Sequence, residues 1–197
     1  MEGKCFSLEK FLIEVSARHV HLNSDAVDVL FGKAYNLKLK KSLSQKGQYL
    51  CEEKVAVVGS RAQFAAVSVL GPVRENVQVE LSKTDARSIG VDAPIRESGD
   101  LKGSGSCKLV GPKGEIYLKE GVIVSKRHIH VNNEGAKLLN VKDKDVVCVN
   151  ICSKDRSAIL KDVVVRVSDD FTLSMHIDTD EANAINFSGE KGEVIKV

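Results

Sequence analysis

The chain has 197 residues, of which 43% are hydrophobic and 28% are charged. This balance is typical of a globular protein and excludes a disordered one. The formal net charge is only +2 and tryptophan is absent, so we expect neither a nucleic-acid partner nor a membrane partner. The first residues lack the apolar core of a secretory signal, and no stretch approaches the length of a membrane span. Five scattered cysteines fit reduced thiols in a cytoplasmic protein better than a disulfide framework.

The first predicted elements are a strand that ends in a His-x-His motif and a short helix behind it. His19 and His21 are two residues apart, so in a strand both imidazoles point to one face and can reach one metal ion. Imidazole suits several divalent ions, and zinc is the usual choice where no redox role is implied. Residues 23–25 form a helix-capping signal, which predicts a helix that ends near Phe31.

Three β-branched runs follow and predict short strands at residues 55–58, 67–70 and 77–81. A Gly-Pro turn before the third strand presents Arg74, whose guanidinium matches the oxygens of phosphate or carboxylate. From the residues alone, a surface arginine is as good an interpretation as an anion clamp. Glu80 lies on the polar face of the third strand, and catalytic zinc sites often combine histidine with a carboxylate. The Gly- and Ser-rich residues 98–106 predict a linker or a mobile loop.

A second His-x-His motif opens the other half of the chain. Residues 124–132 repeat residues 15–23, so His128 and His130 correspond to the first pair. A capping signal at residues 132–134 again predicts a short helix, which ends near residue 139. Four of the five histidines lie in these two copies, which indicates an internal duplication rather than coincidence.

The last predicted elements are two strands, a third strand that contains His176, and a helix. The first two strands are β-branched runs at residues 146–149 and 163–167. Apolar and polar residues alternate from Phe171 to Asp178, which places His176 on the polar face, where it can bind a metal. A third short helix is predicted after residues 178–181. Many short strands with three short helices indicate a mainly β, barrel-like architecture.

Together these motifs resemble the phosphate propanoyltransferase family, the phosphotransacylases of bacterial microcompartments and their cytosolic relatives. The resemblance runs from about Phe11 to the C-terminus and is carried by residues 16–21, 71–80, 96–99, 121–130 and 176–184. It implies two β-barrel domains capped by short α-helices, one formed by residues 1–17 plus 126–197 and the other by residues 18–125. It also implies a reversible reaction of an acyl-CoA (propanoyl-CoA or acetyl-CoA) with phosphate that gives an acyl phosphate and CoA, and a homodimer.

The same resemblance implies a role for each candidate site residue, with two zinc ions per chain. One zinc, whose open position takes the sulfur of CoA, would be held by His19, His21 and Glu80. The second zinc, completed by water or substrate, would be held by His128, His130 and His176. Arg74 would be the catalytic residue that binds phosphate. We expect direct transfer in a ternary complex, because well-oriented reactants need no covalent acyl-enzyme.

Two departures from the family pattern bear on these expectations. Residues 58–62 replace a Gly-Pro-Lys-Gly turn that the family tends to have and that recurs here as residues 111–114, so we expect no ligand role for residues 58–62. The segment before the first motif is short for a microcompartment targeting peptide, which weakens the case for encapsulation and is compatible with a free cytoplasmic enzyme that uses acetyl-CoA.

Two other classes of protein are compatible with paired His-x-His motifs. A non-catalytic, zinc-stabilised structural protein would saturate its metal with protein ligands and leave no open position. A metal-dependent hydrolase of the amidohydrolase type would need a (β/α)₈ barrel of about 250 residues. The chain lacks both the length and the helices for such a barrel, which argues against the hydrolase.

Overall fold

The computed structural model describes residues 9–195, so Cys5 and part of the segment before the first motif lie outside it. The chain forms two compact units. Residues 17–126 form one unit, and the described residues up to Ser16 together with those from Arg127 onward form the other. The chain therefore passes from one unit to the other shortly before each His-x-His motif.

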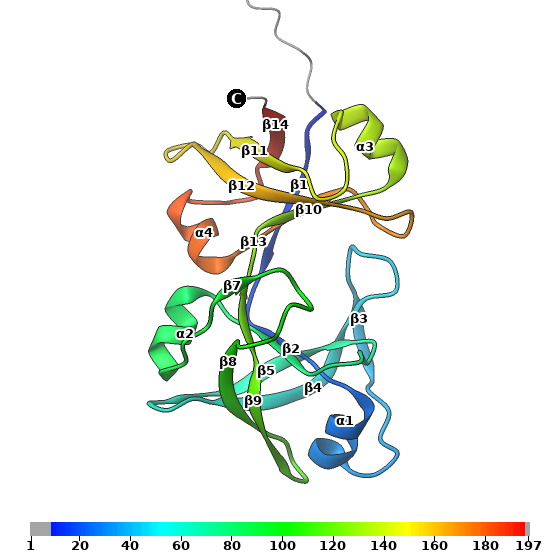
Figure 1. Cartoon of the computed structure of the whole chain (residues 1–197), viewed down its shortest axis with the longest axis vertical. Helices are drawn as coiled ribbons and strands as arrows, with labels where there is room; N and C mark the ends of the chain where they lie inside the picture. The colour runs from blue at the N-terminus through cyan, green and yellow to red at the C-terminus, as the bar shows by residue number, and fades with distance from the viewer. Residues whose placement is uncertain (1–8, 196–197) are drawn as a thin grey trace, which may run out of the picture. The chain divides into compact units, whose positions relative to one another are not determined.

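The unit of residues 17–126 is a closed barrel with two short helices (Figure 1). Around the ring lie β4 (Tyr49–Val58), β5 (Gln63–Gly71), β2 (His19–His21), β6 (Gln78–Glu80), β9 (Glu115–Ser125) and β8 (Gly105–Val110), which pairs with β4 again. Two further strands attach to this ring, β3 (Leu39–Ser42) to β4 and β7 (Ile95–Arg96) to β9. The helices are α1 (Ser24–Phe31) and α2 (Lys83–Ile89).

The other unit is a second closed barrel. Around its ring lie β11 (Val146–Ile151), β12 (Ala158–Val167), β10 (His128–Val131), β13 (Ser174–Asp178), β1 (Phe11–Ser16) and β14 (Lys191–Ile195), which pairs with β11 again. Its helices are α3 (Asn133–Leu139) and α4 (Thr179–Ala184). The predicted fold class, mainly β with two barrels and short helices, is confirmed.

The two rings have the same sequence of parallel and antiparallel pairs. In each, the His-x-His strand is parallel to one neighbour (β5 or β12) and antiparallel to the other (β6 or β13). β9 and β1 then occupy equivalent places, each parallel to the strand that bears the third candidate ligand. Yet each precedes the His-x-His strand of the other barrel in the chain. The duplicated halves have therefore exchanged their first strands.

Each barrel has its own apolar core, made mainly of β-branched residues that suit a half-buried pleated surface. In the barrel of residues 17–126, Val20, Val57, Val69, Val79 and Leu109 have no exposed surface. In the other barrel the same is true of Ile129, Val149, Ile151, Val163 and Met175. Closing each sheet on itself leaves no unpaired edge within the ring, and this lets three-residue strands such as β2 persist.

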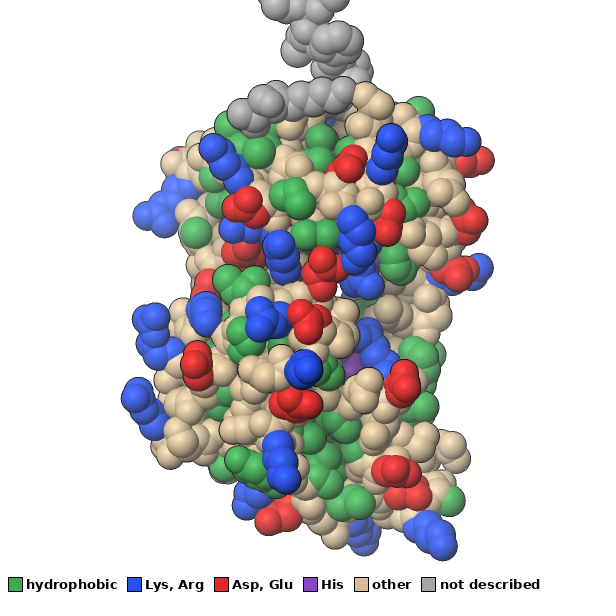
Figure 2. All heavy atoms as spheres, viewed as in Figure 1, with side chains coloured by type: hydrophobic (Ala, Val, Ile, Leu, Met, Phe, Trp, Pro, Cys, Tyr) green, Lys and Arg blue, Asp and Glu red, His purple; other side chains and the backbone are tan. Residues whose placement is uncertain are grey.

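The three predicted helices begin at the predicted caps. The side chains of Asn23, Asn132 and Asp178 accept hydrogen bonds from backbone N–H groups in the first turns of α1, α3 and α4, at 2.8–2.9 Å. The sequence prediction missed α2, although Ser82 caps it and Gly90 ends it in the left-handed conformation. No helix among residues 9–195 is long and apolar enough to cross a membrane. On the face shown in Figure 2, basic and acidic side chains are interspersed.

Two β-turns bind the C-terminal ends of helices in the barrel of residues 17–126. The β8–β9 turn donates the Lys113 N–H to the Leu30 carbonyl of α1 at 3.0 Å, and the β4–β5 turn donates the Arg61 N–H to the Ile89 carbonyl of α2 at 3.0 Å. A Cβ on Gly111 would lie 2.4 Å from the Leu30 oxygen, and one on Gly59 would lie 2.1 Å from the Ile89 oxygen. The β4–β5 turn lacks the Gly-Pro-Lys-Gly sequence of the family, yet it makes the same kind of contact as the β8–β9 turn, which has that sequence.

Because these contacts leave no room for a methyl group, we expect Gly111→Ala to lower the free energy of unfolding by about 1–3 kcal/mol. Urea unfolding followed by circular dichroism measures this change. Lys113→Ala in the same turn is the control, since it keeps the backbone N–H and should change stability by less than about 0.5 kcal/mol. Equal unfolding midpoints for Gly111→Ala and the parent protein would show that the turn can move away from α1.

Candidate metal centres

Strands β2 and β6 bring His19, His21 and Glu80 together. The strands are antiparallel, with His19 directly opposite Glu80. Nε2 of His19 lies 3.6 Å, and Nε2 of His21 3.9 Å, from the same carboxylate oxygen, Oε1 of Glu80. Ligand atoms bound to one tetrahedral zinc ion lie roughly 3.5 Å apart, because each is about 2.0–2.2 Å from the metal. The spacing of these three side chains therefore suits three ligands of one ion.

The two histidines of this cluster have pKa values that are shifted in opposite directions. Burial lowers the pKa of His19, but the charge and hydrogen bond of Glu80, together with the Ala17 carbonyl, outweigh burial, so the pKa is raised above its usual value. Burial, and then the positive charges of His19 and Arg74, lower the pKa of His21 to about 3. His21 is therefore a neutral imidazole at neutral pH, which is the form that binds a metal ion. A buried carboxylate facing two imidazoles is a donor set that fits zinc.

Strands β10 and β13 bring the other three histidines together in the second barrel. His128 lies directly opposite His176, as His19 lies opposite Glu80. The three ring centroids are 4.6–5.2 Å apart, and one nitrogen of each ring lies within 4.8 Å of the other two. His176 points away from the buried Met175 and Ile177, as the alternation predicts. Three converging imidazoles also fit a zinc ion with positions left for other ligands.

Arg74 lies close enough to the first cluster for its positive charge to act against protonation of both histidines. The cis Gly71–Pro72 peptide lies between β5 and this residue, and the Arg74 N–H donates to the Leu22 carbonyl at 2.8 Å. Nη1 of its guanidinium donates to the Ser98 hydroxyl at 3.2 Å. The predicted anion-binding residue and the predicted cation site thus share one barrel.

Two residues of this site, Gln78 and Ser98, were missed by the sequence prediction. The amide nitrogen of Gln78, a buried side chain, donates to Oε1 of Glu80 at 2.6 Å and to the Ser98 hydroxyl at 2.8 Å. The Gly99 N–H donates to the amide oxygen of Gln78 at 2.8 Å. One buried amide therefore connects the candidate ligand Glu80 with the hydroxyl that contacts Arg74. The sequence signal that could have identified Gln78 is its spacing of two residues from Glu80, because residues 78 and 80 share a strand face.

Residues 98–106, expected to be a linker or a mobile loop, lie within one barrel and do not connect the two units. Residues 98–104 form hydrogen-bonded turns, in which the Ser104 N–H donates to the Leu101 carbonyl at 3.1 Å, and residues 105–106 begin β8. The Ser104 hydroxyl in turn accepts from the Gly121 N–H at 2.8 Å. The loop is thus tied to β9, and it holds Ser98 and Gly99 against Gln78.

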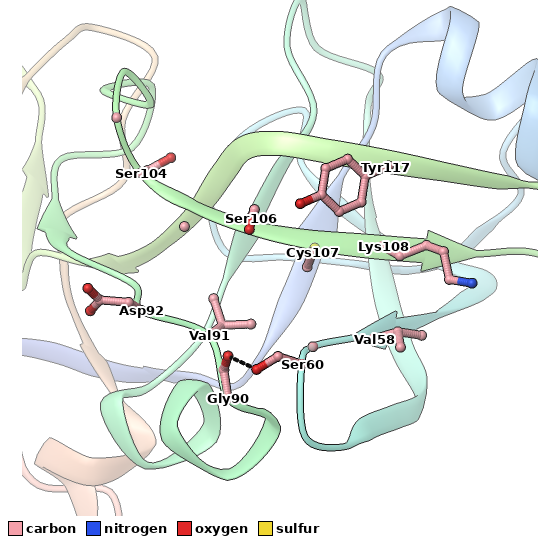
Figure 3. Close-up of a pocket in the computed structure, with 13 residues that line it drawn as sticks. Val58, Ser60, Gly90, Val91, Asp92, Ser104, Ser106, Cys107, Lys108 and Tyr117 are labelled. Carbon is pink, nitrogen blue, oxygen red and sulfur yellow. Dashed lines mark hydrogen bonds between the residues drawn. The ribbon is translucent and has the colours of Figure 1, made fainter.

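A pocket of about 570 Å³ lies elsewhere in the same barrel, at the ends of β4 and α2 and along β8 and β9 (Figure 3). Its lining is rich in glycine and serine, with Asp92, Lys108 and Tyr117 as its larger polar side chains. The Ser60 hydroxyl donates to the Gly90 carbonyl at 2.6 Å. None of the candidate metal ligands lines this pocket, and neither does Arg74.

Comparison with known proteins places the chain in a family. The family model described as phosphate propanoyltransferase matches residues 12–188. The phosphate propanoyltransferase of Leptotrichia buccalis is 52% identical over 190 residues, which cover 95% of this chain and 89% of the relative. That of Thermotoga maritima is 48% identical over 173 residues (88% and 82%), and that of Listeria monocytogenes is 46% identical over 185 residues (93% and 86%). The chain therefore belongs to the phosphate propanoyltransferase family of acyltransferases.

Proposed function

We propose that the protein interconverts acyl-CoA plus phosphate with acyl phosphate plus CoA, using propanoyl-CoA or acetyl-CoA and two zinc ions, one in each barrel. The observation that supports this most directly is the convergence of His19, His21 and Glu80 on one point with Arg74 beside them. A cation site and an anion-binding arginine in one barrel suit a reaction between a thioester and phosphate.

The two clusters would bind different reactants. We assign the position left open by His19, His21 and Glu80 to the sulfur of CoA, and the positions left open by the three histidines of the other barrel to water or substrate. Bound zinc supplies a Lewis acid that favours the thiolate of CoA and polarises an acyl carbonyl. A purely structural zinc site would need a fourth protein ligand, whereas His19, His21 and Glu80 form a group of three within the described chain.

The chain's own residues bind and orient the reactants. Arg74 would hold phosphate, with Ser98 accepting a hydrogen bond from its guanidinium and fixing its direction. A phosphate oxygen then attacks the thioester carbonyl, the new C–O bond forms, the C–S bond breaks, and CoA leaves as a thiolate. Such positioning supplies about 7–11 kcal/mol in well-oriented cases, so no acyl-enzyme is required. Ping-pong kinetics would contradict this direct transfer.

Three further statements remain predictions from the sequence. Each barrel would be a domain, with residues 1–17 plus 126–197 in one and 18–125 in the other. The protein would be a homodimer. It would lie in the cytoplasm, where a microcompartment could enclose it.

The proposal is tested by measuring phosphate-dependent release of CoA from acetyl-, propanoyl- and butyryl-CoA. We expect zinc-loaded protein to release CoA from the acetyl or propanoyl thioester only when phosphate is present. Removing the metal with a chelator should abolish this activity, and added zinc should restore it, because the donor sets fit zinc. The absence of CoA release from all three thioesters by zinc-loaded protein would refute the proposed function.

A variant separates the role of Arg74 from that of the metal. We expect Arg74→Ala to raise the KM for phosphate and to lower kcat/KM for phosphate by about 10–150-fold, which corresponds to losing about 1.5–3 kcal/mol of charge-assisted hydrogen bonding. The KM for acyl-CoA and the zinc content should change little. Arg61→Ala, which removes an exposed arginine of the same barrel, is the control. An unchanged KM for phosphate in Arg74→Ala would exclude Arg74 as the phosphate-binding residue.

A further inference from the structure

We propose that Arg18 and Arg127 are positioning residues, each fixing one metal-ligand cluster by binding a carboxylate on the helix that follows the third ligand. The inference rests on the proposed function, because it assumes that the two clusters bind zinc. It concerns two residues to which the proposed function assigns no role. It is supported by the same arrangement in both barrels.

In the barrel of residues 17–126, Arg18 directly precedes the first ligand, His19. Its Nη1 donates to both carboxylate oxygens of Asp85, at 2.8 and 2.9 Å. Its guanidinium also lies over the ring of Phe64 on β5, 4.2 Å from the ring centroid. The arginine is therefore held by an acidic side chain and an aromatic face at once, although 41% of its side-chain surface is exposed.

The partner Asp85 has a defined place relative to the third ligand. It lies five residues after Glu80, in the first turn of α2. The Asp85 N–H donates to the hydroxyl of the N-cap residue, Ser82, which lies two residues after Glu80. The end of β6, the cap and the carboxylate thus form one short connected segment. An arginine that binds this carboxylate connects the segment after Glu80 with the residue before His19.

The second barrel repeats the arrangement with different residues. Arg127 directly precedes His128, and its Nε lies 3.1 Å from Oε1 of Glu181. Glu181 is five residues after His176, in the first turn of α4, and its N–H donates to the side chain of the N-cap, Asp178, at 2.8 Å. Here the third ligand is histidine rather than glutamate. The arginine–carboxylate pair therefore occurs at the same place relative to the third ligand, whether that ligand is glutamate or histidine.

The two strands that carry His19, His21 and Glu80 are too short to fix their own register strongly. β2 and β6 have three residues each, and a slip of one residue would turn their side chains to the opposite faces of the sheet. α2 has seven residues and α4 six, so neither helix would be stable without tertiary contacts. The ion pair between Arg18 and Asp85 lies just beyond the paired residues of β2 and β6. It opposes both a slip in the register of these strands and fraying of α2.

A purely structural role predicts a different outcome. An acidic residue in a first turn stabilises a helix without any arginine. Exposed ion pairs typically add little to global stability. A positioning role instead predicts a local effect on one metal site, since outer residues that orient metal ligands typically change affinity by about 10–100-fold.

The test measures zinc affinity by competition with a chromophoric chelator, together with zinc content per chain, in Arg18→Gln, Asp85→Asn, Arg127→Gln and Glu181→Gln. We expect each change to weaken one of two sites by about 10–100-fold and to leave the other unchanged. Lys108→Gln is the matched control, because the exposed pair Lys108–Glu115 lies in the same barrel at 3.0 Å but joins β8 to β9. This control should bind zinc like the parent protein.

The affected site is identified in backgrounds that retain one cluster. Arg18→Gln should weaken the remaining site of a His130→Ala protein and spare that of a His21→Ala protein, and Arg127→Gln should do the reverse. Arg18→Lys keeps the charge without the planar guanidinium and should bind with intermediate affinity. Circular dichroism confirms that each variant is folded, and Asp85→Asn and Glu181→Gln replace any arginine variant that is not.

Three results would overturn the inference. Parent-like zinc affinity in both members of a pair, Arg18→Gln and Asp85→Asn, would exclude positioning and leave the metal centres standing. Equal weakening of both sites by one change would indicate general destabilisation instead. A parent protein that takes up no zinc would remove the metal centres themselves, and the positioning role with them.

Discussion

The candidate site depends on one antiparallel pairing, which occurs once in each barrel. A His-x-His strand lies beside a strand that carries one further donor, and the register places the first histidine directly opposite that donor. Side chains on paired positions of a sheet lie about 5 Å apart, so this pairing alone brings three donors from two strands within reach of one ion. Closure of the ring, the caps and the arginine contacts all act to keep this register in place.

The two barrels share one arrangement of strands but carry different third donors. Glu80 is the third donor in one barrel and His176 in the other, and each has a hydrogen-bonded partner two residues earlier in its strand. Gln78 donates to Glu80 at 2.6 Å, whereas the Ser174 hydroxyl lies 3.1 Å from Nε2 of His176. A carboxylate lowers the net charge of a zinc site by one relative to imidazole, so the two metal ions would differ as Lewis acids.

The sequence predicted what depends on neighbouring residues. Both His-x-His pairs, the three caps and the polar face of His176 follow from spacings of two to four residues, and the structure has them as expected. Gln78 and Ser98 were missed because their roles depend on a loop 20 residues further along the chain. The helix α2 was missed although Ser82 caps it, and with seven residues it is no shorter than α3, which was predicted. The grouping of donors from separate strands came from the family resemblance, since spacing does not reveal which strands pair.

The exchange of β1 and β9 has a consequence for how such a chain can arise. A single ancestral half would carry a first strand that its own ring does not use, and its ring would lack one strand. Two such halves complete their rings only if each contributes its first strand to the ring of the other, as subunits do in a domain-swapped dimer. The present chain has the connectivity expected if the genes of such a dimer were fused end to end. A gene split between the two copies would therefore encode two fragments that each need the other to fold.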